Sequence, residues 1–98
     1  MITVYVMNTC PDCTYIEEQI KDNPNFKIID IGEHVHNLKA FLSLRDNHEA
    51  FKKVRERGTV GIPAFVLENG DVTLRAEEVG LVSRKKGLSC NLDNREGC

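Results

Sequence analysis

Two cysteines near the start of the chain, Cys10 and Cys13, have the spacing of a CxxC pair. Side chains at positions i and i+3 of a helix lie on one face, so these thiols are close enough to form a small-ring disulfide. Free N–H groups and the helix dipole stabilise a thiolate at a helix start, and the thiolate is the species that attacks a disulfide. We therefore predict that Cys10 is a nucleophile and that Cys13 resolves the mixed disulfide that Cys10 forms.

The two residues between the cysteines fit a helix start. Pro11 suits the first turn, where a missing N–H costs nothing, and the carboxylate of Asp12 favours the positive end of the helix dipole. The charge of Asp12 also opposes ionisation of Cys10, by less than about 1 kcal/mol at a surface site. We expect Asp12 to tune the thiol pair without silencing it.

A strand, a helix and a second strand should position this pair. Residues 2–7 and 26–31 are short apolar runs typical of buried strands. Between them the predicted helix begins at Pro11 and ends at about Asn23, because Pro24 disfavours helical geometry in the residue before it. The three elements together predict a βαβ unit with parallel strands.

The apolar stripe of this helix predicts how the two thiols are oriented. Cys13, Ile16 and Ile20 recur at positions i, i+3 and i+7, which is the spacing of a buried helix face. We therefore expect Cys13 to face the core, and we expect Cys10, at the helix cap, to stay reachable from solvent.

The middle of the chain predicts two further helices. The first has apolar residues at helical spacing from Val35 to Leu42. Asp46, with Glu49 three residues later, resembles a capping box that starts the second helix. That helix should end at Gly58, a residue suited to a left-handed C-cap. Its buried residues are expected to be Ala50, Phe51 and Val54.

The last part of the domain predicts a hairpin. Residues 63–67 and 72–74 are typical of antiparallel strands, and Asn69-Gly70 between them is a strong signal for a two-residue turn. A final short helix is expected over residues 76–86.

Two segments resemble known proteins. The run from Val4 to the Cys-Pro-Asp-Cys sequence of residues 10–13 is similar to the first strand and active site of the glutaredoxins. Ile62-Pro63, followed by the hairpin, is similar to the cis-proline segment of the wider thioredoxin superfamily. The similarity covers roughly residues 1–75. It implies an α/β, thioredoxin-like fold with a four-stranded mixed sheet and helices on both faces.

The resemblance also implies where a substrate binds. Pro63 would be cis and would lie beside Cys10, and the backbone of Ile62 would offer hydrogen bonds to an extended substrate. Pro11 and Asp12, between the cysteines, would complete the substrate-binding set.

Several positions depart from the glutaredoxin pattern. Met7 stands where glutaredoxins usually carry a basic residue for the glutathione carboxylate, and Val60 stands where they often carry an arginine. Arg75-Ala76-Glu77-Glu78 replaces their Gly-Gly and acidic motif, while Arg55 or Arg57 could supply a substitute cation. Glutathione and a thioredoxin-reductase-type donor are therefore both open as the reductant.

We interpret the chain as a dithiol thiol–disulfide oxidoreductase that reduces protein or glutathione mixed disulfides, with Cys10 and Cys13 as its catalytic residues. This interpretation requires no bound cofactor and no metal, and glutathione would serve only as a co-substrate. The alternative is a zinc-thiolate protein that adds Cys90 and Cys98 to the pair, although C-x7-C is not a usual zinc-ribbon spacing. A redox-inert interaction module of the same fold is a third hypothesis.

The composition restricts location and partners. The 98 residues, 41% of them hydrophobic, predict one compact domain over residues 1–86 and an irregular tail over 87–98. A net charge of −2 gives no general attraction to nucleic acid or anionic lipid. No run approaches the roughly 18 apolar residues of a membrane span, and no secretory signal follows Met1. We expect a cytoplasmic monomer that acts on disulfide-containing proteins and binds neither nucleic acid nor membrane.

The remaining polar clusters are expected to have structural roles. His34, His36 and His48 should be exposed or should cap helices, and Arg84-Lys85-Lys86 should be a solvated helix end. In a reducing cytosol Cys90 and Cys98 should stay reduced.

Overall fold

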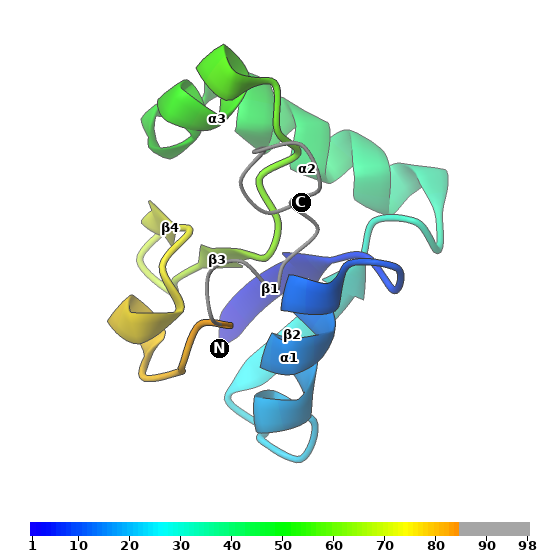
Figure 1. Ribbon diagram of the computed structural model, residues 1–98, viewed down its shortest axis with the longest axis vertical. Helices are drawn as coiled ribbons and strands as arrows, with labels where there is room; N and C mark the ends of the chain where they lie inside the picture. Colours follow the sequence, from blue (N-terminus) through cyan, green and yellow to red (C-terminus); the bar gives the residue numbers. More distant parts are fainter. Residues whose placement is uncertain (85–98) are drawn as a thin grey trace.

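The computed structural model describes residues 1–84 of the chain (Figure 1). The predicted tail, with Cys90 and Cys98, and the last two residues of the predicted terminal helix lie outside the described residues. In chain order the elements are β1 (Ile2–Val6), α1 (Pro11–Ile20), β2 (Phe26–Asp30), α2 (Val35–Asn47), the 3-10 turn η1 (Glu49–Phe51), α3 (Lys52–Arg57), β3 (Ala64–Val66), β4 (Val72–Thr73) and the 3-10 turn η2 (Ala76–Val79).

The four strands form one mixed sheet in the order β2-β1-β3-β4. β1 and β2 are parallel, with Ile2 opposite Phe26 and Val6 opposite Asp30. β3 runs antiparallel to both β1 and β4. The predicted βαβ unit, the hairpin and the α/β class with a four-stranded mixed sheet are thereby confirmed, in the arrangement of a thioredoxin-like fold.

Helices cover both faces of the sheet. The ring of Tyr5 in β1 lies 5.7 Å from the ring of Phe41 in α2, so α2 covers the face to which Tyr5 points. Val4 and Val6 point to the opposite face, because side chains alternate along a strand, and both are buried. Figure 1 shows α1 on a different side of β1 from α2 and α3. Helix α1 and the α2–α3 pair therefore belong to different layers.

α1 begins as predicted and ends earlier than predicted. Cys10 is its N-cap and Pro11 occupies its first turn. The helix ends at Ile20, three residues before the expected end. The side-chain oxygen of Asn23 accepts the N–H of Asn25 at 2.9 Å, and the N–H of Asn23 donates to Ile20 O. This asparagine turn takes the chain out of the helix before Pro24 is reached.

The predicted cap at Asp46 is wrong, because Asp46 lies inside α2. The break falls two residues later, where His48 Nδ1 accepts the N–H of Ala50 at 3.0 Å and starts η1. His34 caps the start of α2 through its own Nδ1 in the same way. The expectation that histidines cap helices is therefore confirmed at two positions, and α3 ends as expected at Gly58, whose φ is +73°.

The C-terminal elements differ from the prediction in two details. Leu67 donates its N–H to Asp71 O at 2.8 Å, so three residues form the hairpin loop in place of two. Gly70 ends this loop with φ +93°, which suits a three-residue turn. The predicted helix from residue 76 is a single 3-10 turn within the described residues, since Gly80 ends it in a left-handed conformation.

Candidate active site

The geometry of the thiol pair is set by the first turn of α1. Cys10 is the N-cap, and its Sγ accepts the backbone N–H of Cys13 at 3.3 Å. The carbonyl of Cys10 accepts the N–H of Thr14 at 3.0 Å, while its own N–H donates to Met7 O at 3.0 Å. Both thiols are free, so the structure is that of the dithiol form.

One of the two thiols is more deeply buried than the sequence suggests. Cys13 is fully buried, as predicted. Cys10 is only 4% exposed, so the expectation that it stays reachable from solvent is wrong. The Cys10 side chain points toward the first turn of α1, where it accepts the Cys13 N–H. It belongs to the same buried cluster as Ile62.

The electrostatics of the pair are asymmetric. The hydrogen bond from the Cys13 side chain, assisted by backbone N–H groups of Cys13 and Asp12, lowers the pKa of Cys10, against the opposing effects of burial and the Asp12 charge. The same side-chain hydrogen bond, together with burial, raises the pKa of Cys13, and the charge of Glu17 adds to this effect. Cys10 is therefore the thiol that ionises first, and Cys13 holds its proton.

Asp12 pairs with a residue from the far end of the described chain. Arg84 Nη1 lies 3.4 Å from Asp12 Oδ1, and both side chains are largely shielded, with exposures of 26% and 19%. The expectation that Arg84 is part of a solvated helix end is therefore wrong. The sequence does not indicate this contact, since 72 positions separate the two residues.

Gln19 fastens the same C-terminal segment to α1. Its Nε2 donates to Val82 O at 2.8 Å and its Oε1 accepts the N–H of Val82 at 3.0 Å. One residue further on, Ser83 donates its N–H to Glu77 Oε2. A hydrogen bond from the Ser83 side chain, assisted by backbone N–H groups of Glu77 and Ser83, lowers the pKa of Glu77. Residues 81–84, which we call the C-terminal strap, are thus held across α1 by Asp12 and Gln19, whose positions are two helical turns apart.

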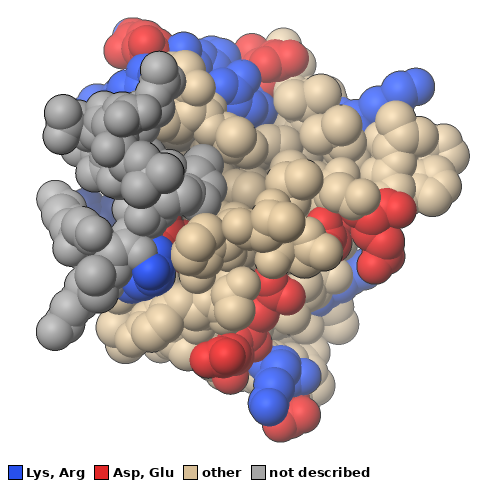
Figure 2. Space-filling model, turned by 45° about the vertical axis from the view of Figure 1, so that its right-hand side comes forward, with Lys and Arg blue, Asp and Glu red and all other residues tan. Residues whose placement is uncertain are grey.

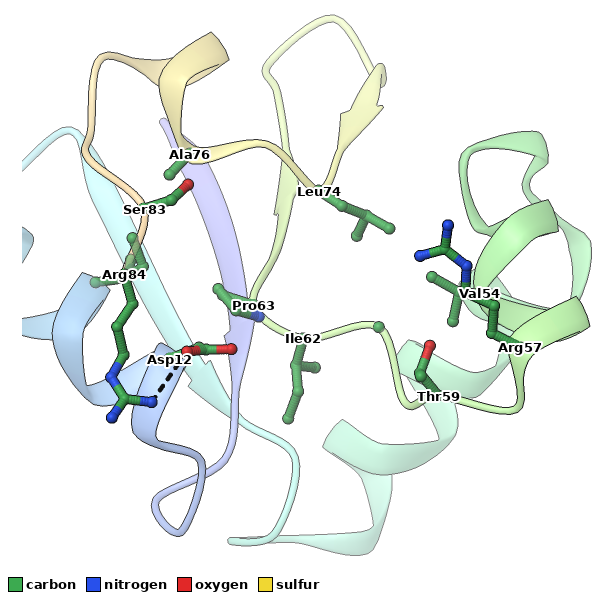
Figure 3. Close-up of a pocket in the computed structure, with 12 residues that line it drawn as sticks. Asp12, Val54, Arg57, Thr59, Ile62, Pro63, Leu74, Ala76, Ser83 and Arg84 are labelled. Carbon is green, nitrogen blue, oxygen red and sulfur yellow. Dashed lines mark hydrogen bonds and ion pairs between the residues drawn. The ribbon is translucent and has the colours of Figure 1, made fainter. Parts of the chain in front are cut away.

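A cavity of about 220 Å³ lies between α1, the strap and the loop before β3. It brings together Asp12, Ile62 and Pro63, three of the four residues predicted to bind substrate (Figure 3). Pro11 lines a neighbouring hollow instead, and Arg84 borders both. The Ile62-Pro63 peptide bond is cis, as the resemblance implied.

Arg45 holds the loop that precedes Pro63, and Arg55 holds the end of the helix that carries Arg45. Arg45 Nε donates to Val60 O at 2.9 Å and its Nη2 donates to Thr59 O. Arg55 Nη1 in turn donates to Arg45 O at 2.6 Å and to His48 O at 3.0 Å. Arg55 therefore holds carbonyls at the end of α2 and does not line the cavity.

Arg57, the other candidate cation, lines a different hollow from Met7 and Val60, two of the residues that depart from the glutaredoxin pattern. Arg57 lines the cavity beside Ile62 and Pro63. Met7 and Val60 are both partly exposed, and they line a mostly apolar hollow with Leu38 and Leu42. A ligand in the cavity meets Arg57 and Arg84, whereas a ligand in the apolar hollow meets Met7 and Val60.

The metal-binding alternative has its second pair of thiols outside the described residues. Among residues 1–84, no three or more side chains of His, Cys, Asp or Glu gather into a group that could hold a metal ion. The zinc hypothesis needs Cys90 and Cys98, which are not described.

Within residues 1–84, no helix has both the length and the apolar character required to cross a bilayer.

A comparison with known proteins identifies a relative that covers most of the chain. An uncharacterized protein of Haemophilus influenzae is 31% identical over 80 residues, which cover 81% of this chain and 93% of the relative. The chain belongs to the family of this protein. No family model matches the chain, and no solved structure shows significant similarity to it. Membership of this family assigns no activity to the chain.

Proposed function

We propose that this protein is a glutaredoxin-like dithiol thiol–disulfide oxidoreductase of the cytoplasm. The observation that carries the proposal is the asymmetric pair at the start of α1. The N–H of Cys13 donates to Cys10 Sγ, the pKa of Cys10 is lowered and that of Cys13 is raised. A nucleophile that ionises readily, next to a thiol that keeps its proton until needed, is the arrangement that two-step disulfide exchange requires.

In the first step the Cys10 thiolate attacks a substrate disulfide R–S–S–R′. A bond forms between Cys10 Sγ and one substrate sulfur, the substrate S–S bond breaks, and R′–S⁻ leaves and takes a proton from solvent. Because Cys10 is only 4% exposed, the substrate must displace the groups that cover Cys10 before attack.

In the second step Cys13 resolves the mixed disulfide. Cys13 Sγ attacks Cys10 Sγ, an intramolecular disulfide forms, and R–S⁻ leaves with the proton that Cys13 releases. Once Cys10 is bonded to the substrate it no longer carries a negative charge, so one of the causes that raise the pKa of Cys13 disappears. Two electrons and two protons have then passed from the dithiol to the substrate.

Turnover requires a reductant that regenerates the dithiol. Two glutathione molecules, which leave as glutathione disulfide, or the dithiol of a thioredoxin-reductase-type protein would balance the reaction. Arg57 and Arg84 line the cavity next to Pro63 and supply positive charge for a carboxylate. The uncharged Met7 offers no such contact on the other side of the loop.

Substrate binding is proposed for the cavity and its borders. The backbone of Ile62 would hydrogen-bond an extended substrate, and Pro63, Pro11 and Asp12 would border the reacting sulfurs. A coupled turnover assay tests the function as a whole. The wild-type protein should reduce a disulfide substrate with glutathione or with thioredoxin reductase as donor, whereas Cys10→Ser should be inactive with both. Failure of the wild type with both donors would contradict the proposal.

A further inference from the structure

A further hollow, of about 1020 Å³, lies between α3 and β4 at one end of the sheet. Lys52 and Lys53 line it from α3, and Val72, Thr73 and Arg75 line it from the β4 side. We call this hollow the α3–β4 groove. β4 is the last strand of the sheet and pairs only with β3 among the described residues, so an edge strand lines one side of the groove.

The α3–β4 groove adjoins the candidate active site. It shares Val54, Arg57 and Leu74 with the cavity beside Pro63. Figure 3 shows Val54 and Arg57 at the opposite end of that cavity from Asp12 and Arg84, with Leu74 between the two ends. A substrate segment that occupies the cavity can therefore continue into the groove.

The groove is positively charged, although the whole chain has a net charge of −2. Its basic residues are Lys52, Lys53, Arg57 and Arg75, and its acidic residues are Glu49 and Glu78. Arg75 and Glu78, 4.0 Å apart, partly offset each other, and the other basic residues still outnumber Glu49. Among residues 1–84, the structure gives Lys52 and Lys53 no ion pair, and both are exposed. Figure 2 shows basic side chains gathered at the end of the molecule where α3 lies.

We propose that the α3–β4 groove binds an extended, acidic segment of the protein substrate, next to the disulfide that Cys10 attacks. Two observations favour this occupant: the excess of positive charge in the groove and its continuity with the cavity. An open strand edge also offers backbone groups to an extended chain. The inference rests on the proposed function and specifies its substrate class, namely proteins with acidic residues flanking the reactive cysteine.

The test compares three disulfide substrates in the full-length protein. Two are peptides of equal length, one with four glutamates and one with four lysines beside the cysteine, and the third is the small uncharged bis(2-hydroxyethyl) disulfide. The groove variant is Lys52→Glu with Lys53→Glu. The matched control is Lys21→Glu with Lys27→Glu, which changes the net charge equally at exposed positions in the α1 and β2 region.

We expect the wild type to favour the acidic peptide. The groove variant should raise KM for that peptide about tenfold and leave the reduction of bis(2-hydroxyethyl) disulfide unchanged, because attraction at two positions becomes repulsion. The control variant should change KM by less than about twofold. Equal effects of the two variants, or equal KM values for the acidic and basic peptides in the wild type, would overturn the inference.

A binding measurement separates this inference from the proposed function. A fluorescent, cysteine-free acidic peptide should bind the wild type and bind the groove variant about tenfold more weakly by anisotropy. If the wild type reduces no disulfide and still binds this peptide through Lys52 and Lys53, the redox proposal fails and the groove assignment stands. If exchange proceeds and the peptide does not bind, the groove assignment fails alone. Binding of anionic phospholipid vesicles without binding of the peptide would likewise overturn it.

Discussion

The carboxylate of Asp12 lies 3.4 Å from the guanidinium of Arg84, between the two cysteines in sequence and beside the cavity that contains Pro63. The charge of Asp12 raises the pKa of Cys10, and it is among the smaller of the causes acting on that thiol. Arg84 offsets that charge at close range. The C-terminal strap is thereby coupled to the ionisation of the nucleophile.

This pair predicts opposite effects of two substitutions. Asp12→Asn should lower the pKa of Cys10, because a charge that opposes the thiolate is removed. Arg84→Gln should raise it, because the Asp12 charge is no longer offset. Each shift should be about 0.5 pKa unit, since both partners are partly solvated.

The rate of Cys10 alkylation by iodoacetamide as a function of pH measures these shifts. In the wild type the rate should rise with pH through a pKa below the ordinary thiol value, since the folded protein favours the thiolate. Asp22→Asn, at an exposed position beyond the end of α1, is the control and should leave the profile unchanged. Shifts of the same sign in Asp12→Asn and Arg84→Gln would contradict the account.

Gln19 should be the residue that keeps the strap in place. Gln19→Ala removes both hydrogen bonds to Val82 and should lower the free energy of unfolding by about 1 kcal/mol. The more specific effect should be faster amide hydrogen exchange at Val82, whose N–H donates to the Gln19 side chain. Gln19→Glu keeps the acceptor and should preserve most of the protection at Val82. Equal exchange in all three proteins would show that the strap is held by other contacts.

Met7 should limit the use of glutathione. It lines the apolar hollow at the position where glutaredoxins carry a cation, so Met7→Lys should lower KM for glutathione about threefold by adding one exposed ion pair. Met7→Leu is the control for the change of shape and should leave KM unchanged. The same KM in wild type and Met7→Lys would mean that the glutathione carboxylate binds elsewhere, for example at Arg57 and Arg84.

The chain beyond Gly87 should be dispensable for exchange. Truncation after Gly87 removes Cys90 and Cys98, and we expect unchanged turnover of a small disulfide and no zinc in the purified full-length protein. Elemental analysis of both forms provides the measurement. Stoichiometric zinc that is lost on truncation would favour the metal-thiolate alternative.

The order of the elements was predictable because local patterns determine it. Apolar runs placed β1 and β2, and the i, i+3, i+7 spacing of Cys13, Ile16 and Ile20 placed Cys13 in the core. The cis form of the Ile62-Pro63 bond followed from the resemblance and not from any local pattern, since most bonds to proline are trans.

The features that the sequence analysis missed or predicted wrongly are ones that local sequence patterns do not determine. The burial of Cys10 depends on where its side chain turns and on neighbours such as Ile62. The partner of Asp12 lies 72 positions away in the chain. At the end of α2, His48 caps the next turn through its ring nitrogen, and this cap replaces the one predicted at Asp46. These features follow from tertiary packing and competing side-chain hydrogen bonds.

The most direct test of the central claim is to trap the mixed disulfide on Cys10. The two variants compared are Cys13→Ser and Cys10→Ser, each also carrying Cys90→Ser and Cys98→Ser so that only the pair at the start of α1 can react. After brief incubation with an excess of a peptide disulfide, intact mass and peptide mapping should show one peptide on Cys10 of the Cys13→Ser variant, released by dithiothreitol. The Cys10→Ser variant should remain unmodified, because Cys13 is buried and holds its proton. No adduct on Cys10, or an equal adduct on Cys13 of the Cys10→Ser variant, would contradict the account.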